Sequence, residues 1–482
     1  MPGMMPFQNE GTNWRFDTVP QAGLNGRRGY QPRGRGLGGS SAINAMLYVR
    51  GHRWDYDNWA ALGCTGWGWD DVLPVFRRAE NNVRGADAFH GDDGPLHVSD
   101  QDHAHPGSRA FIEAAESLQI PFNPDFNGAR QDGVGLYQVT QKRGERWSAA
   151  RAYLGDGRPP ANLSILTETT VEHLVFEGER AVGVAYRRGG QSHVIRARGG
   201  VILAGGVFGT PQLLMLSGIG PADHLRGHGI DVRIDRAAVG SDLQDHLDYT
   251  AAFETPGDLF LGRSLKGSLR SLGQIWAWFR NRSGAMTTPY AEAGAFLSSR
   301  PGLPAPDIQL HFLIAIVEDH GRARVPGHGY SCHACVLRPE SRGTVRLASA
   351  DAHAAPLIDP AFLTDRRDLV SLMQGVRMMY RILDQPQMAR YEGRDRYPVD
   401  LADDDALEAL IRARSDTIYH PVGTARMGSD RHAVCDPRLK VRGVDGLWIA
   451  DASVMPRLIG GNTNAPSIMI GERCADFVRA EG

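Results

Sequence analysis

The chain has 482 residues, enough for roughly two to four structural units. Hydrophobic residues make up 42% of the chain and charged residues 22%, as in an ordinary globular protein. The formal net charge is -2, from 53 basic and 55 acidic side chains, which argues against a DNA or RNA partner. The first residues, MPGMMPFQNE, lack the basic and apolar regions of a secretory signal. Five sparse cysteines suit a reducing compartment, so we expect a cytoplasmic protein.

Glycine is over-represented, with 58 of 482 residues, so the backbone makes many tight turns or approaches a ligand closely. The first cluster is RGRGLGGSSAIN, residues 33–44. Successive amides in such a loop can form an anion-binding nest. The segment SSAINAMLYVRG then predicts the start of a helix, whose N-terminus favours phosphate. A glycine-rich surface turn is the alternative, and spacing alone does not separate the two.

Hydrophobic periodicity predicts regular elements along the rest of the chain. We expect helices at 70–82, 106–119, 366–385 and 403–414, a β-meander at 163–204, and strands at 308–317 and 330–347. Cys332 and Cys335 have C-x-x-C spacing, a weak signal for metal or redox chemistry. Because their neighbours alternate like a strand, we interpret them as two half-buried thiols.

A strand, turn and helix are predicted between residues 201 and 218. Val201–Gly206 reads as a buried strand, VILAGG. Thr210 suits an N-cap, Pro211 the first helical position, Gln212–Ser217 the helix and Gly218 its stop. Such a unit often forms the ligand-binding edge of an open α/β sheet. A purely structural crossover is the alternative.

Residues 265–282, LKGSLRSLGQIWAWFRNR, predict an amphipathic helix with a basic face. Such a helix can lie on a membrane surface. The other interpretation, which we favour, is a helix that covers a catalytic cleft.

His420 begins the segment HPVGTARMG. Because a proline follows it, His420 belongs in an extended or turn backbone. Its ordinary pKa lies near operating pH, so it can serve as a general base. With 17 histidines in the chain, a structural hydrogen-bonding role is the alternative.

The C-terminal segment is LWIADASVMPRLIGGNTNAPSIMIGERCADFV. LWIAD predicts a strand that ends at Asp451, and SIMIGERCADFV predicts a helix starting near Ser467. Asn462, Thr463 and Asn464 precede that helix, where side-chain and backbone amides can stabilise a developing negative charge. An ordinary Asx-rich helix cap is the alternative.

Together and in this order, these motifs resemble the glucose–methanol–choline (GMC) oxidoreductase family. Residues 34–57 (GRGLGGSSAINAMLYVRGHRWDYD) and 206–220 (GVFGTPQLLMLSGIG) resemble its two signatures. VGSDLQDHL, residues 239–247, resembles a further element, with Asp242 where Asn is usual. HPVGTARMG and the C-terminal segment complete the resemblance, which covers nearly all of the chain.

The resemblance implies an α/β plus α+β fold, in which a discontinuous Rossmann-like FAD-binding domain joins a substrate domain built on an antiparallel sheet. The implied segments are 1–226 for the N-terminal FAD-binding half, 227–334 for the substrate region and 335–477 for the C-terminal half. His420 is the implied catalytic base and Asn462 its paired residue. Ile43 stands where some relatives attach flavin covalently through His, so we expect non-covalent FAD. The implied FAD-contacting residues are Gly38, Gly39, Ser40, Asn44, Ala45, Val171, Asp451, Ala452 and Asn464.

The implied activity is oxidation of a primary alcohol to the aldehyde by hydride transfer to flavin N5. Oxygen or a quinone-type carrier would take up the electrons. A choline site would need an aromatic cage and a carboxylate, for which Trp276, Trp278, Tyr290 and Glu292 are candidates. General aliphatic or aromatic alcohols are the alternative. A homodimer and attachment to the inner face of a membrane also stay open.

One departure from the family concerns the start of the chain. A member should open with a strand, a G-x-G-x-x-G turn, a helix and a second strand, spanning roughly 30 residues. Here the first residues resemble the segment that follows that unit. We favour the explanation that an internal methionine has been taken as the start. The alternatives are that the chain is a fragment, or that it is a divergent, non-catalytic partner protein without FAD. A parallel sheet without its central strand exposes polar and apolar groups, so we expect low stability. Without G-x-G-x-x-G, an NAD enzyme is disfavoured.

Overall fold

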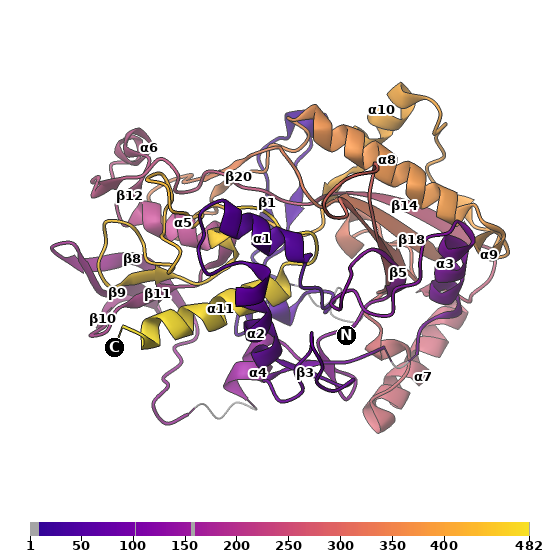
Figure 1. Cartoon of the computed structure of the whole chain (residues 1–482), viewed down its shortest axis with the longest axis horizontal. Coiled ribbons are helices and arrows are strands. Elements are labelled where there is room, and N and C mark those ends of the chain that lie inside the picture. The colour runs from indigo at the N-terminus through magenta and orange to yellow at the C-terminus, as the bar shows by residue number, and fades with distance from the viewer. Residues whose placement is uncertain (1–8, 102, 156–159, 482) are drawn as a thin grey trace.

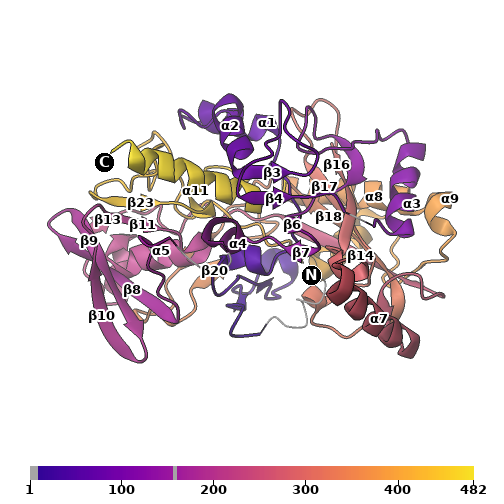
Figure 2. The same ribbon diagram turned by 90° about the horizontal axis from the view of Figure 1, so that it is seen from below.

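The chain folds into two halves that lie side by side along its long axis (Figures 1 and 2). The computed structural model describes residues 9–101, 103–155 and 160–481. Residues 1–8, where we found no secretory signal, lie outside the described residues. We call the two parts the large-sheet half and the parallel-pair half, after the sheets described below.

The large-sheet half is built on an eight-stranded antiparallel sheet, which confirms the expected antiparallel substrate sheet. Its main path runs β21-β14-β18-β17-β16-β5, with β15 beside β18 and β22 beside β14. The bounds are β5 (Gly133–Leu136), β14 (Leu247–Thr255), β15 (Gly262–Arg263), β16 (Ala291–Leu297), β17 (Ile308–Leu313), β18 (Gly327–Val336), β21 (Arg394–Asp395) and β22 (Asp416–Thr417). These strands come from all three segments implied by the family resemblance, whose boundaries stay a prediction.

Helices α3 (Pro106–Ser117) and α8 (Arg366–Leu383) pack against this sheet. Phe312 on β17 stacks on Phe111 of α3, with ring centroids 5.0 Å apart. Every residue of β16 and β17 is buried. Both faces of these strands are therefore covered, so that their polar side chains Glu292, Gln309 and His311 are buried together with the apolar ones.

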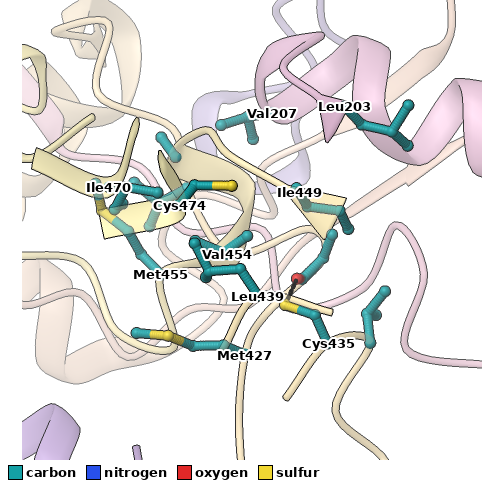
Figure 3. Packing of buried hydrophobic residues seen from close by; sticks show 14 of the residues in the cluster. Leu203, Val207, Met427, Cys435, Leu439, Ile449, Val454, Met455, Ile470 and Cys474 are labelled. Carbon is teal, nitrogen blue, oxygen red and sulfur yellow. Dashed lines mark hydrogen bonds between the residues drawn. The ribbon is translucent and has the colours of Figure 1, made fainter. Parts of the chain in front are cut away.

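The parallel-pair half contains β11 (Val201–Leu203) and β23 (Leu447–Ile449), which pair in parallel although they are far apart in the sequence. Helices α5 (Gly206–Leu216) and α11 (Asn464–Arg479) pack around the pair, and Figure 3 shows the shared core. A three-stranded antiparallel sheet lies beside them: β8 (Thr169–Glu177), β9 (Arg180–Arg188) and β10 (Gln191–Arg196). The expected meander is confirmed over β8–β10, but β11 belongs to the other sheet.

The strand predicted as buried at 201–206 is shorter and partly exposed. β11 covers only Val201–Leu203, and the side chain of Ile202 is 48% exposed. Among the described residues, β11 pairs with one strand, β23, along one of its two edges. The apolar run therefore does not lie inside a wide sheet, and the prediction of burial was wrong for Ile202.

Helix α5 begins earlier than predicted, at Gly206, so Thr210 and Pro211 lie inside it. Thr210 is no N-cap; its hydroxyl donates to Asp451 at 2.6 Å. Pro211 has no amide hydrogen to offer the carbonyl of Val207, four residues back. The hydroxyl of Thr424 donates to that carbonyl at 2.6 Å. This bond replaces the lost helical one, which explains how proline is accommodated. Gly218, with φ +81°, follows the helix end as predicted.

The helix predicted after the glycine cluster does not form. Only a 3-10 turn, η3 (Gly39–Ala42), is present. The Asn44 side chain accepts from the amide of Met46, and Met46 has φ +66°, which turns the chain away from a helix. The next helix, α1 (Arg53–Ala61), starts after His52, which accepts from the amide of Trp54.

The other predicted helices are confirmed with small shifts at their ends: α2 (Trp69–Ala79), α3, α7 (Leu265–Asn281), α8 and α10 (Asp404–Arg414). Helix α11 starts at Asn464, three residues before the predicted start, so Asn464 belongs to the helix. Cys332 and Cys335 are fully buried on β18, not half-buried, because both faces of this strand are covered.

Short elements complete the fold. Among the described residues, no helix is both long and apolar enough to cross a membrane. The short elements are β1 (Phe16–Asp17), η2 (Ala22–Leu24), β2 (Tyr30–Gln31), β3 (Glu80–Asn82), β4 (Leu96–Val98), β6 (Gln141–Lys142), β7 (Glu145–Arg146), α4 (Ala149–Leu154), β12 (Ile219–Gly220), α6 (Ala222–Gly227), β13 (Ile234–Asp235), η4 (Ala285–Thr287), η5 (Asp319–Gly321), β19 (Thr344–Arg346), β20 (Leu357–Asp359), α9 (Pro386–Ala389) and η6 (Ala452–Val454).

Candidate active site

His420 lies in a turn just after β22, in the non-helical backbone that its following proline predicts. Its amide donates to Asp245 Oδ1 at 2.9 Å. The other oxygen of Asp245 accepts from the Thr417 hydroxyl at 2.5 Å and from the Gln31 amide at 3.1 Å. Burial raises the pKa of Asp245 to about 6. This buried carboxyl fixes the backbone that carries His420, whose residue surface is only 8% exposed.

A chain of hydrogen bonds determines which nitrogen of His420 carries the proton. His246 Nε2 lies 3.0 Å from the carbonyl oxygen of Leu337, which only accepts, so Nε2 carries the hydrogen. His246 Nδ1 is therefore the acceptor in its 3.0 Å contact with His420 Nδ1. His420 then carries its hydrogen on Nδ1, and its Nε2 is unprotonated. This assignment follows from the hydrogen-bond network.

The unprotonated Nε2 of His420 faces Asn462. The Asn462 amide nitrogen lies 3.1 Å from His420 Nε2 and can donate to it. Gln309 on β17 donates to Asn462 Oδ1 at 3.2 Å, which fixes the orientation of that amide. Gln309 also donates to the Tyr137 hydroxyl at 3.1 Å. The structure therefore brings together both residues predicted from the sequence, and the large sheet supports the pair.

His420 is held in its neutral form. Burial lowers its pKa well below the ordinary value, and the neighbouring His246, His311 and Arg33 act in the same direction. Burial likewise lowers the pKa of His246 to about 3. A neutral imidazole with an unprotonated Nε2 is the form that accepts a proton, as a general base requires.

The sequence analysis did not single out Asp245, His246 or Gln309. The first two lie in VGSDLQDHL, which we used only for its resemblance to the family. Two polar, titratable residues directly before an apolar strand were a usable signal. Gln309 gave none, because its role depends on the pairing of β17 with β18, which was unknown.

The glycine cluster exposes its backbone, as a cofactor cradle would. Gly38 and Gly39 have φ +87° and +51°, and a side chain added at Gly39 would meet nothing within 4 Å. Ser40 and Ala45 are exposed. Asn44 is engaged within the protein, since Arg146 donates to its side chain at 2.6 Å.

The other implied FAD contacts lie in the parallel-pair half, after the end of β23, at the start of α11 and on β8. Asp451 Oδ2 accepts from the amide of Gly206 at 2.9 Å, besides the bond from Thr210, so its carboxylate ties β23 to α5. Ala452 begins η6, directly after Asp451. Asn464 opens α11, where Thr463 provides no side-chain cap. Val171 lies on β8, in the other sheet, and is 36% exposed. An open glycine turn and an uncapped helix N-terminus fit a phosphate-bearing, electron-accepting group such as FAD.

The aromatic cage considered for choline does not assemble. Trp276 is 63% exposed, whereas Trp278 is buried and donates to the carbonyl of Gly144 at 2.9 Å. Glu292 accepts from the amide of His105, the hydroxyl of Ser108 and the hydroxyl of Thr288, at 2.7–2.8 Å. Its carboxylate is thus committed to the protein. No group of His, Cys, Asp and Glu suited to a metal ion occurs among the described residues.

The GMC oxidoreductase N-terminal family model matches residues 11–248 and the C-terminal model residues 339–471. An alcohol dehydrogenase [acceptor] of Pseudomonas putida is 44% identical over 97% of this chain and 85% of its own length. Human mitochondrial choline dehydrogenase is 42% identical over 97% of this chain and 79% of its own.

Solved structures agree with these matches. Pyridoxine 4-oxidase from Mesorbium loti is 31% identical, with a TM-score of 0.87, over 99% of this chain and 90% of that one. Formate oxidase from Aspergillus oryzae is 27% identical, with a TM-score of 0.91, over the same shares. The family models, the identities over nearly the whole chain and the shared fold agree: the chain belongs to the GMC oxidoreductase family.

Proposed function

We propose that this chain oxidises a primary alcohol to the aldehyde, with His420 as the base that removes the hydroxyl proton. The coarser statement follows from the family: the protein is an oxidoreductase that acts on CH–OH groups and uses FAD. The observation that carries the finer proposal is the unprotonated Nε2 of a buried, neutral His420 beside the amide of Asn462.

In the proposed reaction, the alcohol oxygen replaces the 3.1 Å hydrogen bond between Asn462 and His420 Nε2 and contacts both side chains. His420 accepts the hydroxyl proton, and Asn462 donates to the oxygen as negative charge develops there. When bound, FAD supplies the acceptor for the hydride that leaves the carbinol carbon. No carboxylate of the described residues contacts the His420 ring, so the protonated ring gains little stabilisation. We therefore expect the proton to leave the ring quickly after each turnover.

The proposal is tested with the variant His420→Ala. The matched control is His224→Ala, which changes a histidine on α6, distant in sequence from His420. We expect kcat/KM to fall roughly 100- to 10,000-fold in His420→Ala, as for loss of a general base, with flavin content unchanged. His224→Ala should match the wild type. An unchanged rate in His420→Ala would remove His420 from the mechanism.

We further propose that FAD is bound without a covalent link, because Ile43, at the position where some relatives carry a linking histidine, offers no nucleophile. The purified chain should show a flavin spectrum, and denaturation followed by filtration should release all of the chromophore. A colourless protein would favour the non-catalytic alternative, and a chromophore retained on the chain would contradict the non-covalent proposal.

We also propose that α7 binds the surface of an anionic membrane, where a quinone-type acceptor would be accessible. Trp276 and Phe279 are 63% and 68% exposed, and Ile275 is 38% exposed. Both ribbon views place α7 at the periphery of the large-sheet half (Figures 1 and 2). Residues 264–291 contain four basic residues and no acidic one. Exposed aromatic residues on a basic helix are typical of interfacial binding.

Sedimentation with phosphatidylcholine vesicles, with and without phosphatidylserine, tests this proposal. We expect binding only to the anionic vesicles, and loss of binding in Trp276→Ser/Phe279→Ser. The control Leu357→Ser/Val370→Ser removes two other exposed apolar side chains and should still bind. If the α7 double variant instead changes only the oligomeric state, the face contacts a second copy of the chain and the membrane proposal is wrong.

A further inference from the structure

The hydrogen bonds of the active site form one continuous chain between two backbone carbonyls. One end is the carbonyl of Leu337, which accepts from His246 Nε2 at 3.0 Å. The other end is the carbonyl of Leu310 on β17, which accepts from the Tyr137 hydroxyl at 2.8 Å. Because a carbonyl oxygen only accepts, the chain must donate outward at both ends. The side chains between the two carbonyls are His246, His420, Asn462, Gln309 and Tyr137.

A chain that donates at both ends must contain one group that donates in both directions. The one hydrogen of the Tyr137 hydroxyl goes to Leu310, so the Tyr137 oxygen accepts from its other neighbour. That neighbour is Gln309 Nε2, which carries two hydrogens and lies 3.1 Å from the Tyr137 oxygen and 3.2 Å from Asn462 Oδ1. The direction of the chain therefore reverses at the Gln309 amide nitrogen. This assignment of the amide follows from the hydrogen-bond network.

The surroundings of Gln309 fix its amide in this orientation. Its side chain is fully buried on β17. Its oxygen, Oε1, is buried as well and has no hydrogen-bond partner in the described part of the chain. Turning the amide over would place this oxygen against two other acceptors, the Tyr137 hydroxyl oxygen and Asn462 Oδ1, and oxygens that face each other without a hydrogen repel. One unpaired oxygen is thus the smaller loss, and the two hydrogens stay directed at Tyr137 and Asn462.

The direction of the chain decides which end of the Asn462 amide faces the alcohol. In the proposed reaction the alcohol oxygen contacts both Asn462 and His420. An NH2 group of Asn462 can donate to this oxygen as negative charge develops on it, whereas the carbonyl of Asn462 would repel it. Because Gln309 donates to Asn462 Oδ1, the carbonyl is held away from His420 and the NH2 group is turned toward it.

We propose that Gln309 is a positioning residue for alcohol oxidation, which donates to both Tyr137 and Asn462 and thereby turns the NH2 group of Asn462 toward the alcohol oxygen. The inference rests on the proposed function. Gln309 acts through Asn462 and not by contact with the substrate. A side chain of similar size that cannot donate twice should therefore slow the reaction without weakening the binding of the alcohol.

Gln309→Glu keeps the size of the side chain and tests the two hydrogens. An ionised carboxylate only accepts, so Asn462 should turn its NH2 group toward the carboxylate and its carbonyl toward the alcohol. Protonation returns one hydrogen to the carboxyl, and burial raises its pKa toward neutral pH. In this variant kcat/KM for butan-1-ol should thus fall about tenfold or more between about pH 7 and pH 9, while the wild-type value stays constant. Gln191→Glu, the same change at an exposed position on β10, should keep the wild-type profile.

The native titratable groups near Gln309 and His420 do not account for such a profile. Burial lowers the pKa of His246 to about 3 and that of Arg33 to about 10, and raises that of Asp245 to about 6. These values lie outside the range tested. Burial also moves the pKa of three further groups away from this range: they are Tyr137, His311 and Cys335.

Gln309→Met removes both hydrogens and adds no charge, and it carries the test if Gln309→Glu does not fold. We expect kcat for butan-1-ol to fall about tenfold or more with little change in KM, because an interaction that acts mainly in the transition state is lost. The pH profile should stay flat. An unchanged kcat in Gln309→Met, or parallel pH profiles for Gln309→Glu and the wild type, would overturn the proposal.

An NMR titration of His420 separates this role from the proposed activity. In the flavin-loaded enzyme with isotope-labelled histidine, the His420 signals are those missing from His420→Ala. Protonation of His420 Nε2 should occur about one pH unit or more higher in Gln309→Glu than in the wild type or Gln191→Glu, because the Asn462 carbonyl and the carboxylate favour the charged ring. If this shift occurs but the wild type oxidises no alcohol, the proposed function fails and the role of Gln309 in the network stands. If alcohols are oxidised but neither this titration nor kcat depends on Gln309, the positioning role is wrong and alcohol oxidation stands.

Discussion

The two halves of the molecule differ in how completely their sheets are covered. In the large-sheet half every residue of β16 and β17 is buried between helices and the active-site segments. In the parallel-pair half, β11 pairs with β23, and the side chain of Ile202 on β11 is 48% exposed. The proposed catalytic network is anchored in the covered half, through His246, Gln309 and Leu337. The rigidity of the proposed base therefore depends on the large sheet, whereas the implied FAD contacts Val171, Asp451, Ala452 and Asn464 lie on the open half.

The largest expected effect follows from this contrast. Phe312→Ala removes a fully buried ring that stacks on Phe111, and should lower the free energy of unfolding by about 3–5 kcal/mol. Phe279→Ala, in the same half but 68% exposed, is the matched control and should change it by less than about 0.5 kcal/mol. Urea denaturation measures both. Equal effects would mean that the large sheet is not the rigid part of the molecule.

A second prediction concerns the pH dependence of stability. The folded-state pKa of His246 is lowered to about 3, and that of His420 is also lowered, below their ordinary value of 6.5. Between about pH 3 and 6.5 these two imidazoles thus bind more protons in the unfolded chain than in the folded one, so their contribution to stability falls as the pH drops through this range. Thermal melts from pH 4 to pH 8 should show this loss.

His246→Gln isolates the contribution of one ring, since glutamine can also donate to Leu337 and accept from His420. We expect a shallower loss of stability with falling pH in this variant. His353→Gln, at an exposed position, should keep the wild-type slope. A slope unchanged by His246→Gln would show that this ring does not titrate as its burial predicts. The lowered pKa of His420 predicts that kcat/KM for alcohols stays constant down to a pH below 6.

A third, smaller effect is expected at Thr424, which holds α5 against the turn that follows His420. Thr424→Val keeps the shape of the side chain but leaves the carbonyl of Val207 without its donor. We expect a loss of about 1–3 kcal/mol in the free energy of unfolding. The double variant Thr424→Val/Pro211→Ala restores an amide that can donate to Val207 and should recover part of that loss. If the double variant is no more stable than Thr424→Val, the Thr424 hydroxyl does not replace the helical hydrogen bond that Pro211 lacks.

The sequence predicted element types better than the contacts that complete them. Amphipathic helices such as α8 and α10 were found because their periodicity is local. The polar pair His420 and Asn462 was found through family motifs. Gln309 was missed because its role depends on the pairing of β17 with β18, which places it beside Asn462. The burial of Ile202 was overestimated for the same reason: an apolar strand pattern does not reveal how many neighbours the strand has.

The smallest expected effect tests the open side of the parallel pair directly. Ile202→Ala removes a side chain that is 48% exposed, so we expect a loss below about 1 kcal/mol. Ile449→Ala changes the same residue type on β23, where the side chain is fully buried, and should cost about 2–5 kcal/mol. The ratio of the two losses measures how unequally this small sheet is covered. A loss at Ile202 as large as that at Ile449 would mean that something covers β11 in solution. Since the implied FAD contacts Asp451, Ala452 and Asn464 lie in this half, repeating the measurement after removal of the flavin would show whether the cofactor is responsible.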